Sequence, residues 1–196
     1  MKRDKKPNFF ILGAPKCGTT AMADWLSQHP NVFMCDPKEP HFFNTDSNHH
    51  GASSLEHYES FFENVSDKHK MVGEASVWYL MSSDAVKNIL KYQPDARFIV
   101  FVRNPMEMAP SLHDQRKFSG DEDINDFETA WSVQEQRKSL DKSIPKTCTD
   151  VRYLLYGECC KLGFMLERLY SRVPKDKVHV GVMDDIKTSV RNEYLK

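Results

Sequence analysis

Apolar residues along this chain occur either in short unbroken runs or at intervals of three and four, with polar segments between them. The unbroken runs have the length of buried strands, at 9–12, at 32–34 and within 97–102, where only Arg97 is polar. A further strand is predicted at 178–182, and a mixed strand or turn at 71–77. The helically spaced segments are 19–28, 55–62, 84–92, 127–140, 151–170 and a last helix from Ile186. Strands that alternate with helices in this way predict right-handed crossovers and a parallel sheet, which is an α/β fold.

The first apolar run leads into a loop with the composition of an anion site. Loop 13–18 contains two glycines and a proline, and a helix is predicted to begin at Thr19. A strand, a glycine loop and a helix in succession aim unpaired backbone N–H groups and the positive end of the helix at an anion. Lys16 adds a mobile positive charge inside the loop. The alternative is an ordinary turn with a solvated lysine.

The position of this lysine disfavours a nucleoside triphosphate. In a Walker A loop the lysine immediately precedes the final Ser or Thr and reaches the β- and γ-phosphates. Here Thr19 occupies that position and the lysine is at position 16. A shorter anion, such as a 5′-phosphate that bears one further group, fits a lysine in the middle of the loop better.

A second loop follows the third apolar run. Asn104 is placed to cap a helix whose first residue is Pro105, and Pro110 should kink or restart that helix. Segments 13–20 and 103–111 both lie just beyond the carboxyl end of a predicted strand, where parallel sheets bind ligands. The two segments can therefore face one crevice.

The length and the charge of the chain limit the number of domains and the kinds of ligand to expect. The chain has 196 residues, which is about one domain, 1–196, and 40% of them are hydrophobic. Its formal net charge of -1 argues against a general nucleic-acid binder, so any anion site depends on cations placed locally. No segment approaches the roughly 20 apolar residues of a membrane span.

The cysteines favour a reducing compartment. They are odd in number and irregular in spacing, and they are Cys17, Cys35, Cys148, Cys159 and Cys160. No CxxC or other metal-site spacing occurs, so reduced thiols and a cytoplasmic location are the simplest expectation. A chain trimmed of a leader or anchor would look the same.

Two polar segments and several histidines have no motif assigned to them. Segments 44–54 and 120–126 are predicted to be surface loops, because they are polar or acidic and lack calcium-loop spacing. Four histidines could suggest zinc, and they are His41, His49, His50 and His57. Their spacing on a loop favours scattered surface histidines, so no metal is expected.

Three motifs resemble those of sulfotransferases that use 3′-phosphoadenosine 5′-phosphosulfate (PAPS). Segment 15–20, PKCGTT, resembles the 5′-phosphosulfate loop, and Arg103-Asn104-Pro105 with Ser111 resembles the 3′-phosphate motif. Segment 38–43, KEPHFF, is similar to a third segment of the heparan-sulfate-type and related bacterial branch. The similarity spans residues 9 to about 186 and implies a P-loop NTPase-like sulfotransferase fold, a parallel sheet flanked by helices.

The resemblance implies a donor and the residues that bind it. The donor would be PAPS, without a metal, and the acceptor would be a hydroxyl of a carbohydrate or small-molecule alcohol. Backbone N–H groups would hold the 5′-phosphate, from Cys17, Gly18, Thr19 and Thr20, with the threonine hydroxyls as further donors. Lys16 would neutralise charge that grows on the bridging oxygen, and Arg103 and Ser111 would hold the 3′-phosphate.

The resemblance also implies a general base. An alcohol has a high pKa, and in the resembling branch the glutamate of the third segment, here Glu39, takes the acceptor proton. His41 would orient Glu39 or share its work, since in a strand-like backbone positions 39 and 41 point to the same side. The alternative is a surface Lys38/Glu39 pair and a structural His41.

The chain departs from the family pattern in three places. Ala75 stands in a segment where relatives often carry a lysine, and Cys159 stands where a tyrosine is common. Relatives also continue beyond the final helix into a basic loop, so we expect either a fragment or incomplete closure over the nucleotide. Two other functions stay open, a P-loop nucleotide kinase or NTPase and a catalytically silent nucleotide-binding module.

Overall fold

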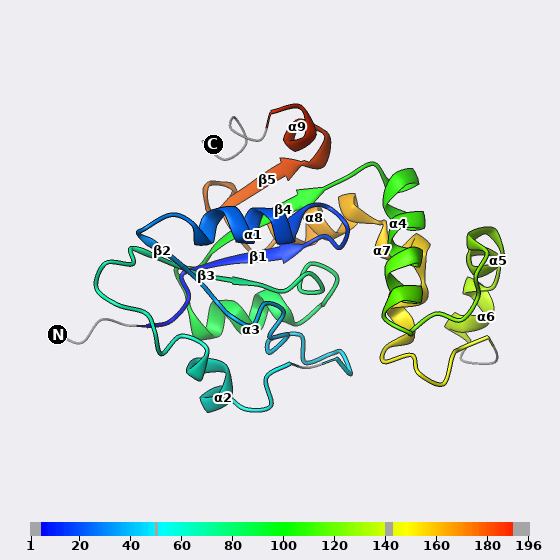
Figure 1. Ribbon diagram of the computed structural model, residues 1–196, viewed down its shortest axis with the longest axis horizontal. Helices are drawn as coiled ribbons and strands as arrows, with labels where there is room; N and C mark the ends of the chain where they lie inside the picture. Colours follow the sequence, from blue (N-terminus) through cyan, green and yellow to red (C-terminus); the bar gives the residue numbers. More distant parts are fainter. Residues whose placement is uncertain (1–4, 50, 140–142, 190–196) are drawn as a thin grey trace.

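The computed structural model describes residues 5–49, 51–139 and 143–189, and these fold around one parallel sheet (Figure 1). The strands are β1 (Phe9–Gly13), β2 (Val32–Met34), β3 (Met71–Ala75), β4 (Arg97–Val102) and β5 (Val178–Val182). They lie in the order β2-β3-β1-β4-β5, and every neighbouring pair is parallel. The predicted α/β fold is confirmed.

Helices flank the sheet and also gather beyond one end of it. They are α1 (Thr19–Ser27), α2 (Leu55–Ser60), α3 (Ala85–Tyr92), α4 (Pro105–Phe118), α5 (Phe127–Ser132), α6 (Gln134–Lys138), α7 (Tyr156–Cys159), α8 (Leu162–Tyr170) and α9 (Met183–Thr188). Two 3-10 turns, η1 (Val151–Leu154) and η2 (Lys175–Lys177), complete the described elements. In Figure 1, α4, α5 and α6 lie beyond the carboxyl ends of the strands.

The central strand β1 forms the middle of the core. All five of its residues are buried, as expected for a parallel strand covered on both faces. The neighbouring strand β4 adds Phe98, Val100 and Phe101, each almost completely buried. In β3, a Cβ at Gly73 would lie 2.2 Å from the ring of Phe9, so only glycine fits where these strands pack.

Helix α4 is more continuous than predicted. It runs without interruption through Pro110, which was expected to kink or restart it. Proline removes one helical hydrogen bond, but the inward face of α4 buries Met108, Ala109 and Leu112 in the core. Burial of that face offsets the lost hydrogen bond. The polar residues of α4 therefore lie along one continuous helix.

The helices predicted further along the chain are more broken than their apolar spacing indicates. Segment 127–140 contains two short helices, α5 and α6, and segment 151–170 contains η1, α7 and α8. Leu155 (φ -89°, ψ 73°) and Lys161 (φ -75°, ψ 51°) leave the helical conformation at the two breaks within 151–170. The last helix begins at Met183, three residues before the predicted start.

Two segments predicted to be solvated loops are partly buried, so that prediction is wrong for them. In 44–54 the side chains of Asn44 and Ser47 are buried, and Ser47 bonds to the carboxylate of Asp150 at 3.0 Å. In 120–126 both Asp121 and Glu122 are buried. Acidic composition alone misleads here, because the carboxylates find partners inside the fold.

Glu122 forms a buried ion pair with Arg137 on α6. Both side chains have zero exposure, and the two guanidinium nitrogens donate to the carboxylate at 2.7 and 2.8 Å. The Tyr156 hydroxyl donates to the same carboxylate at 2.7 Å. Burial alone would raise the pKa of Glu122, but these hydrogen bonds and that from the Ile124 N–H hold it below its usual value. The ion pair and the Tyr156 hydroxyl therefore join segment 120–126, α6 and α7.

Candidate functional site

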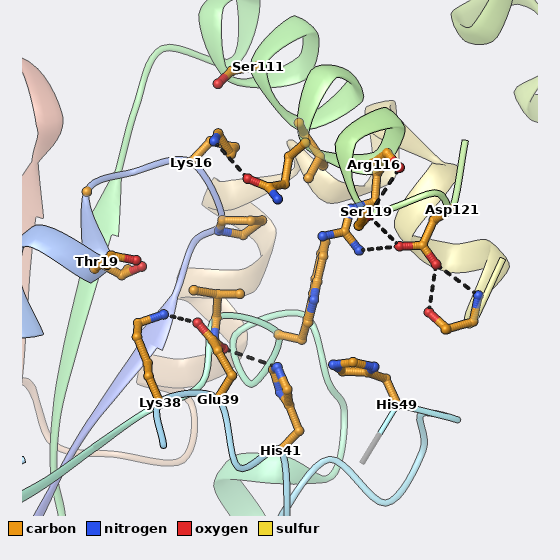
Figure 2. Close-up of a pocket in the computed structure, with 18 of the residues that line it drawn as sticks. Lys16, Thr19, Lys38, Glu39, His41, His49, Ser111, Arg116, Ser119 and Asp121 are labelled. Atoms are coloured by element: carbon orange, nitrogen blue, oxygen red, sulfur yellow. Dashed lines mark hydrogen bonds and ion pairs between the residues drawn. The ribbon is translucent and has the colours of Figure 1, made fainter. Parts of the chain in front are cut away.

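A cavity of about 890 Å³ opens at the carboxyl ends of the strands. Both loops that were expected to share a crevice line it, 13–20 from β1 and 103–111 from β4. Residues from 38–49 and from 147–149 complete the wall (Figure 2). The convergence follows from topology, since β1 and β4 are neighbouring parallel strands.

The first loop leads into the N-terminus of α1 at the wall of the cavity. Lys16 (φ 62°) and Gly18 (φ 86°) have left-handed conformations, and Gly18 precedes the first residue of α1. Among the described residues, no side chain caps the N-terminus of α1. The first-turn N–H groups and the positive end of the helix are thus available to an anion. Thr19 and Thr20 line the same cavity.

The Cys17 side chain belongs to the hydrophobic core rather than to the cavity wall. The side chain is completely buried, and its Sγ lies 3.4 Å from the Pro15 carbonyl oxygen. Burial raises the pKa of the thiol to about 12, so it is neutral at physiological pH. Lys16 and Gly18, on either side of it, line the cavity, whereas Cys17 does not.

Lys16 and Ser111 lie on the same side of the cavity (Figure 2). The Lys16 Nζ donates to Gln115 Oε1 of α4 at 3.2 Å. Ser111 lies one helical turn before Gln115 and also lines the cavity (Figure 2). Helix α4 therefore brings polar side chains to the lysine of the first loop.

Arg103 is turned toward the first loop. Its Nη1 donates to the Lys16 carbonyl oxygen at 3.3 Å. Its Nε and Nη2 donate to Glu107 Oε2 at 3.1 and 2.9 Å. Arg103 therefore forms an ion pair with Glu107 and also lines the cavity. The guanidinium side chain is 19% exposed, so solvent or a ligand can reach it.

Glu39 and His41 meet at the opposite wall of the cavity. Glu39 Oε2 accepts from the Val77 N–H at 2.8 Å and lies 3.1 Å from His41 Nε2. Lys38 Nζ contacts the other carboxylate oxygen. The backbone is not strand-like, because φ is +67° at Glu39 and +44° at His41. The two side chains thus point together as expected, but through a left-handed turn around Pro40.

The prediction of scattered surface histidines is wrong for His41 and correct for His57. His41 is 1% exposed and its ring lies edge-on to that of His49, with centroids 4.7 Å apart. His57 is exposed, and His50 lies outside the described residues. Within the described ranges, no group of three or more His, Cys, Asp or Glu side chains is placed to hold a metal ion.

A buried carboxyl lies beneath this histidine. Glu74 of β3 has zero exposure and accepts from Ser76 Oγ at 2.6 Å and from the Tyr58 hydroxyl at 3.1 Å. Ser76 Oγ in turn accepts from the His41 N–H at 3.1 Å. Burial raises the pKa of Glu74 to about 7, and burial also lowers the pKa of Lys38 to about 8. Glu74 therefore holds the segment of Glu39 and His41 through Ser76.

Glu74 gives the protein a pH-dependent stability. Its pKa is 4.5 in the unfolded chain and about 7 in the fold, so between these values the folded state holds the extra proton. We expect the free energy of unfolding to fall as pH rises from about 5 to about 8, and Glu74→Gln to remove part of that slope. Denaturant unfolding at several pH values measures it. The exposed Glu63→Gln is the control, and equal slopes in wild type and Glu74→Gln would contradict the assignment.

Part of the cavity was not foreseen. Its end beyond Glu39 is lined by Trp78, Arg116, Ser119, Asp121, Thr147 and Thr149, which we call the distal arm. Arg116 lies five residues after Ser111 on α4, about 140° further around the helix axis, so helical spacing does not group the two. The others come from loops without periodicity, and tertiary contacts alone bring them together.

Comparison with known proteins agrees with this arrangement. A family profile described as "Sulfotransferase domain" matches residues 6–158. The membrane-associated sulfotransferase kil1 of Dictyostelium discoideum is 29% identical over 109 residues, covering 55% of this chain and 22% of that protein. Human heparan sulfate glucosamine 3-O-sulfotransferase 6 is 29% identical over 142 residues, covering 67% of this chain and 40% of that protein. The chain thus spans less than half of either curated relative.

A solved structure shows the same fold. The crystal structure of a sulfotransferase from Alicyclobacillus acidocaldarius superposes with a TM-score of 0.83 at 24% identity, over 96% of this chain and 78% of that one. None of the helices in the described ranges is long and apolar enough to cross a membrane. The profile match covers most of the sequence, and with the P-loop-like parallel sheet it establishes that this chain belongs to the sulfotransferase family.

Proposed function

We propose that this protein transfers a sulfuryl group from PAPS to the hydroxyl of an acceptor, a carbohydrate or a small-molecule alcohol. The observation that carries the proposal is the meeting of three motifs in one cavity. The loop of Lys16, the strand-end Arg103 and the Glu39–His41 pair come from separate parts of the chain and face the same space. Family membership supports sulfuryl transfer as the reaction.

The residues around the loop suit a donor with phosphate groups at both ends. The uncapped N-terminus of α1, the Lys16 ammonium and the hydroxyls of Thr19 and Thr20 match the 5′-phosphosulfate. Arg103, whose planar guanidinium can bind a phosphate through two hydrogen bonds, and Ser111 match the 3′-phosphate. PAPS supplies a sulfuryl group that is already activated by its phosphate.

The opposite wall suits proton removal from an alcohol. The Val77 N–H and His41 both contact Oε2 of Glu39, and these contacts fix that oxygen. Glu39 also lines the cavity, as a general base must. Glu39 would take the proton of the acceptor hydroxyl, and His41 would orient the carboxylate. Lys16 would stabilise the negative charge that develops on the oxygen between phosphate and sulfur as the bond to sulfur breaks.

The cellular location is a separate proposal. All five cysteines are free in the structure, which supports the cytoplasmic location predicted from their spacing. One relative carries "membrane-associated" in its name, so fractionation of cells that express the protein is the direct test.

Ligand-dependent thermal unfolding tests the donor. A ligand that binds only the folded state raises the midpoint by mass action. We expect 3′-phosphoadenosine 5′-phosphate (PAP) to stabilise the protein more than AMP or ATP does, because only PAP presents a phosphate to each cradle. Stabilisation by ATP with magnesium and not by PAP would instead favour the kinase or NTPase alternative. Tight PAP binding without transfer to any acceptor would favour a silent binding module.

Replacing Arg103 tests the 3′-phosphate cradle. We expect Arg103→Ala to weaken PAP binding about 10- to 100-fold and to leave AMP binding almost unchanged, since AMP lacks the 3′-phosphate. Titration calorimetry with both ligands measures the difference. The matched control is Arg97→Ala, at the exposed opposite end of β4. Equal losses for PAP and AMP would show that Arg103 does not read the 3′-phosphate.

A further inference from the structure

The distal arm of the cavity contains one cation and one carboxylate, and they neutralise each other. Arg116 Nη1 donates to Asp121 Oδ2 at 3.2 Å. Elsewhere in the cavity wall, Lys16 and Arg103 face the donor end, and Lys38 is paired with Glu39. Among the described lining residues, the excess positive charge therefore lies where the donor phosphates would bind. In the distal arm, the charges of lysines, arginines and carboxylates add up to zero.

Asp121 is firmly fixed in that position. It is buried, and it accepts from Ser119 Oγ at 2.7 Å and from the N–H and Oγ1 of Thr149, each at 3.1 Å. These bonds and Arg116 hold the pKa of Asp121 below its usual value, although burial alone would raise it. A ligand in the arm therefore meets a carboxylate that stays ionised.

The hydroxyl groups of the arm are arranged as acceptors for a ligand. A hydroxyl has a single proton, and those of Ser119 and Thr149 are directed to Asp121, while that of Thr147 is directed to the Gly120 carbonyl. Their oxygen lone pairs are left to accept. Such a surface matches a molecule rich in O–H donors, whereas a sulfate or carboxylate brings only acceptors.

Arg116 supplies the complementary donor. Its guanidinium carbon lies 5.4 Å from the centroid of the Trp78 ring, which fixes the plane of the group. Its Nε is buried and has no hydrogen-bond partner among the residues that the structure describes. Because that Nε is buried, any N–H that Arg116 offers to a ligand comes from the rest of the guanidinium, on a side chain that is 14% exposed and lines the cavity. Since Asp121 already satisfies the charge, a neutral oxygen acceptor such as a hydroxyl or ring oxygen suits this group.

We propose that the acceptor is an uncharged polyhydroxyl molecule, such as a neutral oligosaccharide, and that Asp121 excludes acceptors with a carboxylate or sulfate near the reacting hydroxyl. The proposal rests on the proposed sulfuryl transfer and specifies its acceptor class. An anionic group in the arm would lie beside a fixed carboxylate and would compete with it for Arg116. Asp121 is thus a specificity-determining residue.

The test compares two acceptors that differ by one charge, cellotriose and the same trisaccharide oxidised to a uronate on one ring. With labelled PAPS, we expect wild type to prefer the neutral trisaccharide about tenfold or more in kcat/KM, and Asp121→Asn to reduce that preference about tenfold. The matched control is Asp123→Asn, an exposed carboxylate two residues away, which should keep the wild-type ratio. Arg116→Gln, which leaves Asp121 without its cation, should sharpen the preference for the neutral acceptor.

The outcomes separate this proposal from the one it rests on. Preference of wild type for the uronate, or an unchanged ratio in a folded Asp121→Asn that PAP still stabilises, would overturn the acceptor assignment. So would PAP stabilisation of wild type with no transfer to either trisaccharide. If Asp121→Asn does not fold, Arg116→Gln decides, and an unchanged ratio there overturns the proposal. Absence of any stabilisation by PAP would instead overturn the proposed function.

Discussion

Replacing Glu39 with glutamine should lower kcat about 10²- to 10⁴-fold, the usual contribution of a positioned general base. The glutamine side chain can still accept the Val77 N–H through its carbonyl oxygen, so the turn around Pro40 should persist. The amide cannot take a proton from an alcohol, so the chemical step alone should be slowed. Single-turnover transfer from PAPS to an acceptor hydroxyl measures this rate.

The binding of PAP separates a lost base from a damaged site. We expect the PAP dissociation constant of Glu39→Gln to stay within a few-fold of wild type, because Glu39 lies across the cavity from the donor loop. Glu128→Gln, on the exposed first turn of α5, is the matched control and should leave both quantities unchanged. Wild-type turnover in Glu39→Gln would remove the assigned role.

Replacing Arg137 with methionine should lower the free energy of unfolding by about 3–5 kcal/mol, because Glu122 would remain buried without its cation. The Tyr156 hydroxyl and the Ile124 N–H alone would then satisfy the carboxylate. For a chain of this length, the loss corresponds to a fall in the unfolding midpoint of roughly 6–20 °C. Calorimetry or denaturant unfolding measures it.

Two further variants identify the cause of that loss. Lys138→Met, at the next residue on α6, removes two exposed ion pairs, to Glu135 and Glu158, and should lower the free energy of unfolding far less than Arg137→Met does. Glu122→Gln combined with Arg137→Met removes both charges and should recover part of the stability. If the double variant is no more stable than Arg137→Met alone, lost packing of the arginine, rather than an unpaired carboxylate, explains the effect.

The sheet and its ligand-binding edge could be predicted because few arrangements suit continuous apolar runs. Runs such as 9–12 and 98–102 are apolar at every position. A short run of this kind is typical of a parallel strand that is covered on both faces. Parallel pairing then places the loops after β1 and β4 at one edge, so the meeting of Lys16 with Arg103 follows from topology.

The rest of the site depends on contacts that have no sequence period. Glu39 and His41 meet because both adopt positive φ, which no local pattern indicates for a glutamate or a histidine. Asp121 lies in an acidic segment that resembles a solvated loop until Arg116 and Thr149 are brought to it. The breaks at Leu155 and Lys161 were equally hidden, because apolar spacing continues across them.

Because α4 is one unbroken helix, it fixes the spacing between the two ends of the cavity. Ser111 faces the donor end and Arg116 the distal arm, so five residues of helix fix their relative direction. One residue inserted between them would rotate Arg116 about 100° around the helix axis and withdraw it from the cavity. If the proposed function holds, exchanging side chains along α4 should change the acceptor preference. Inserting or deleting a residue in α4 should instead turn Arg116 out of alignment with Ser111.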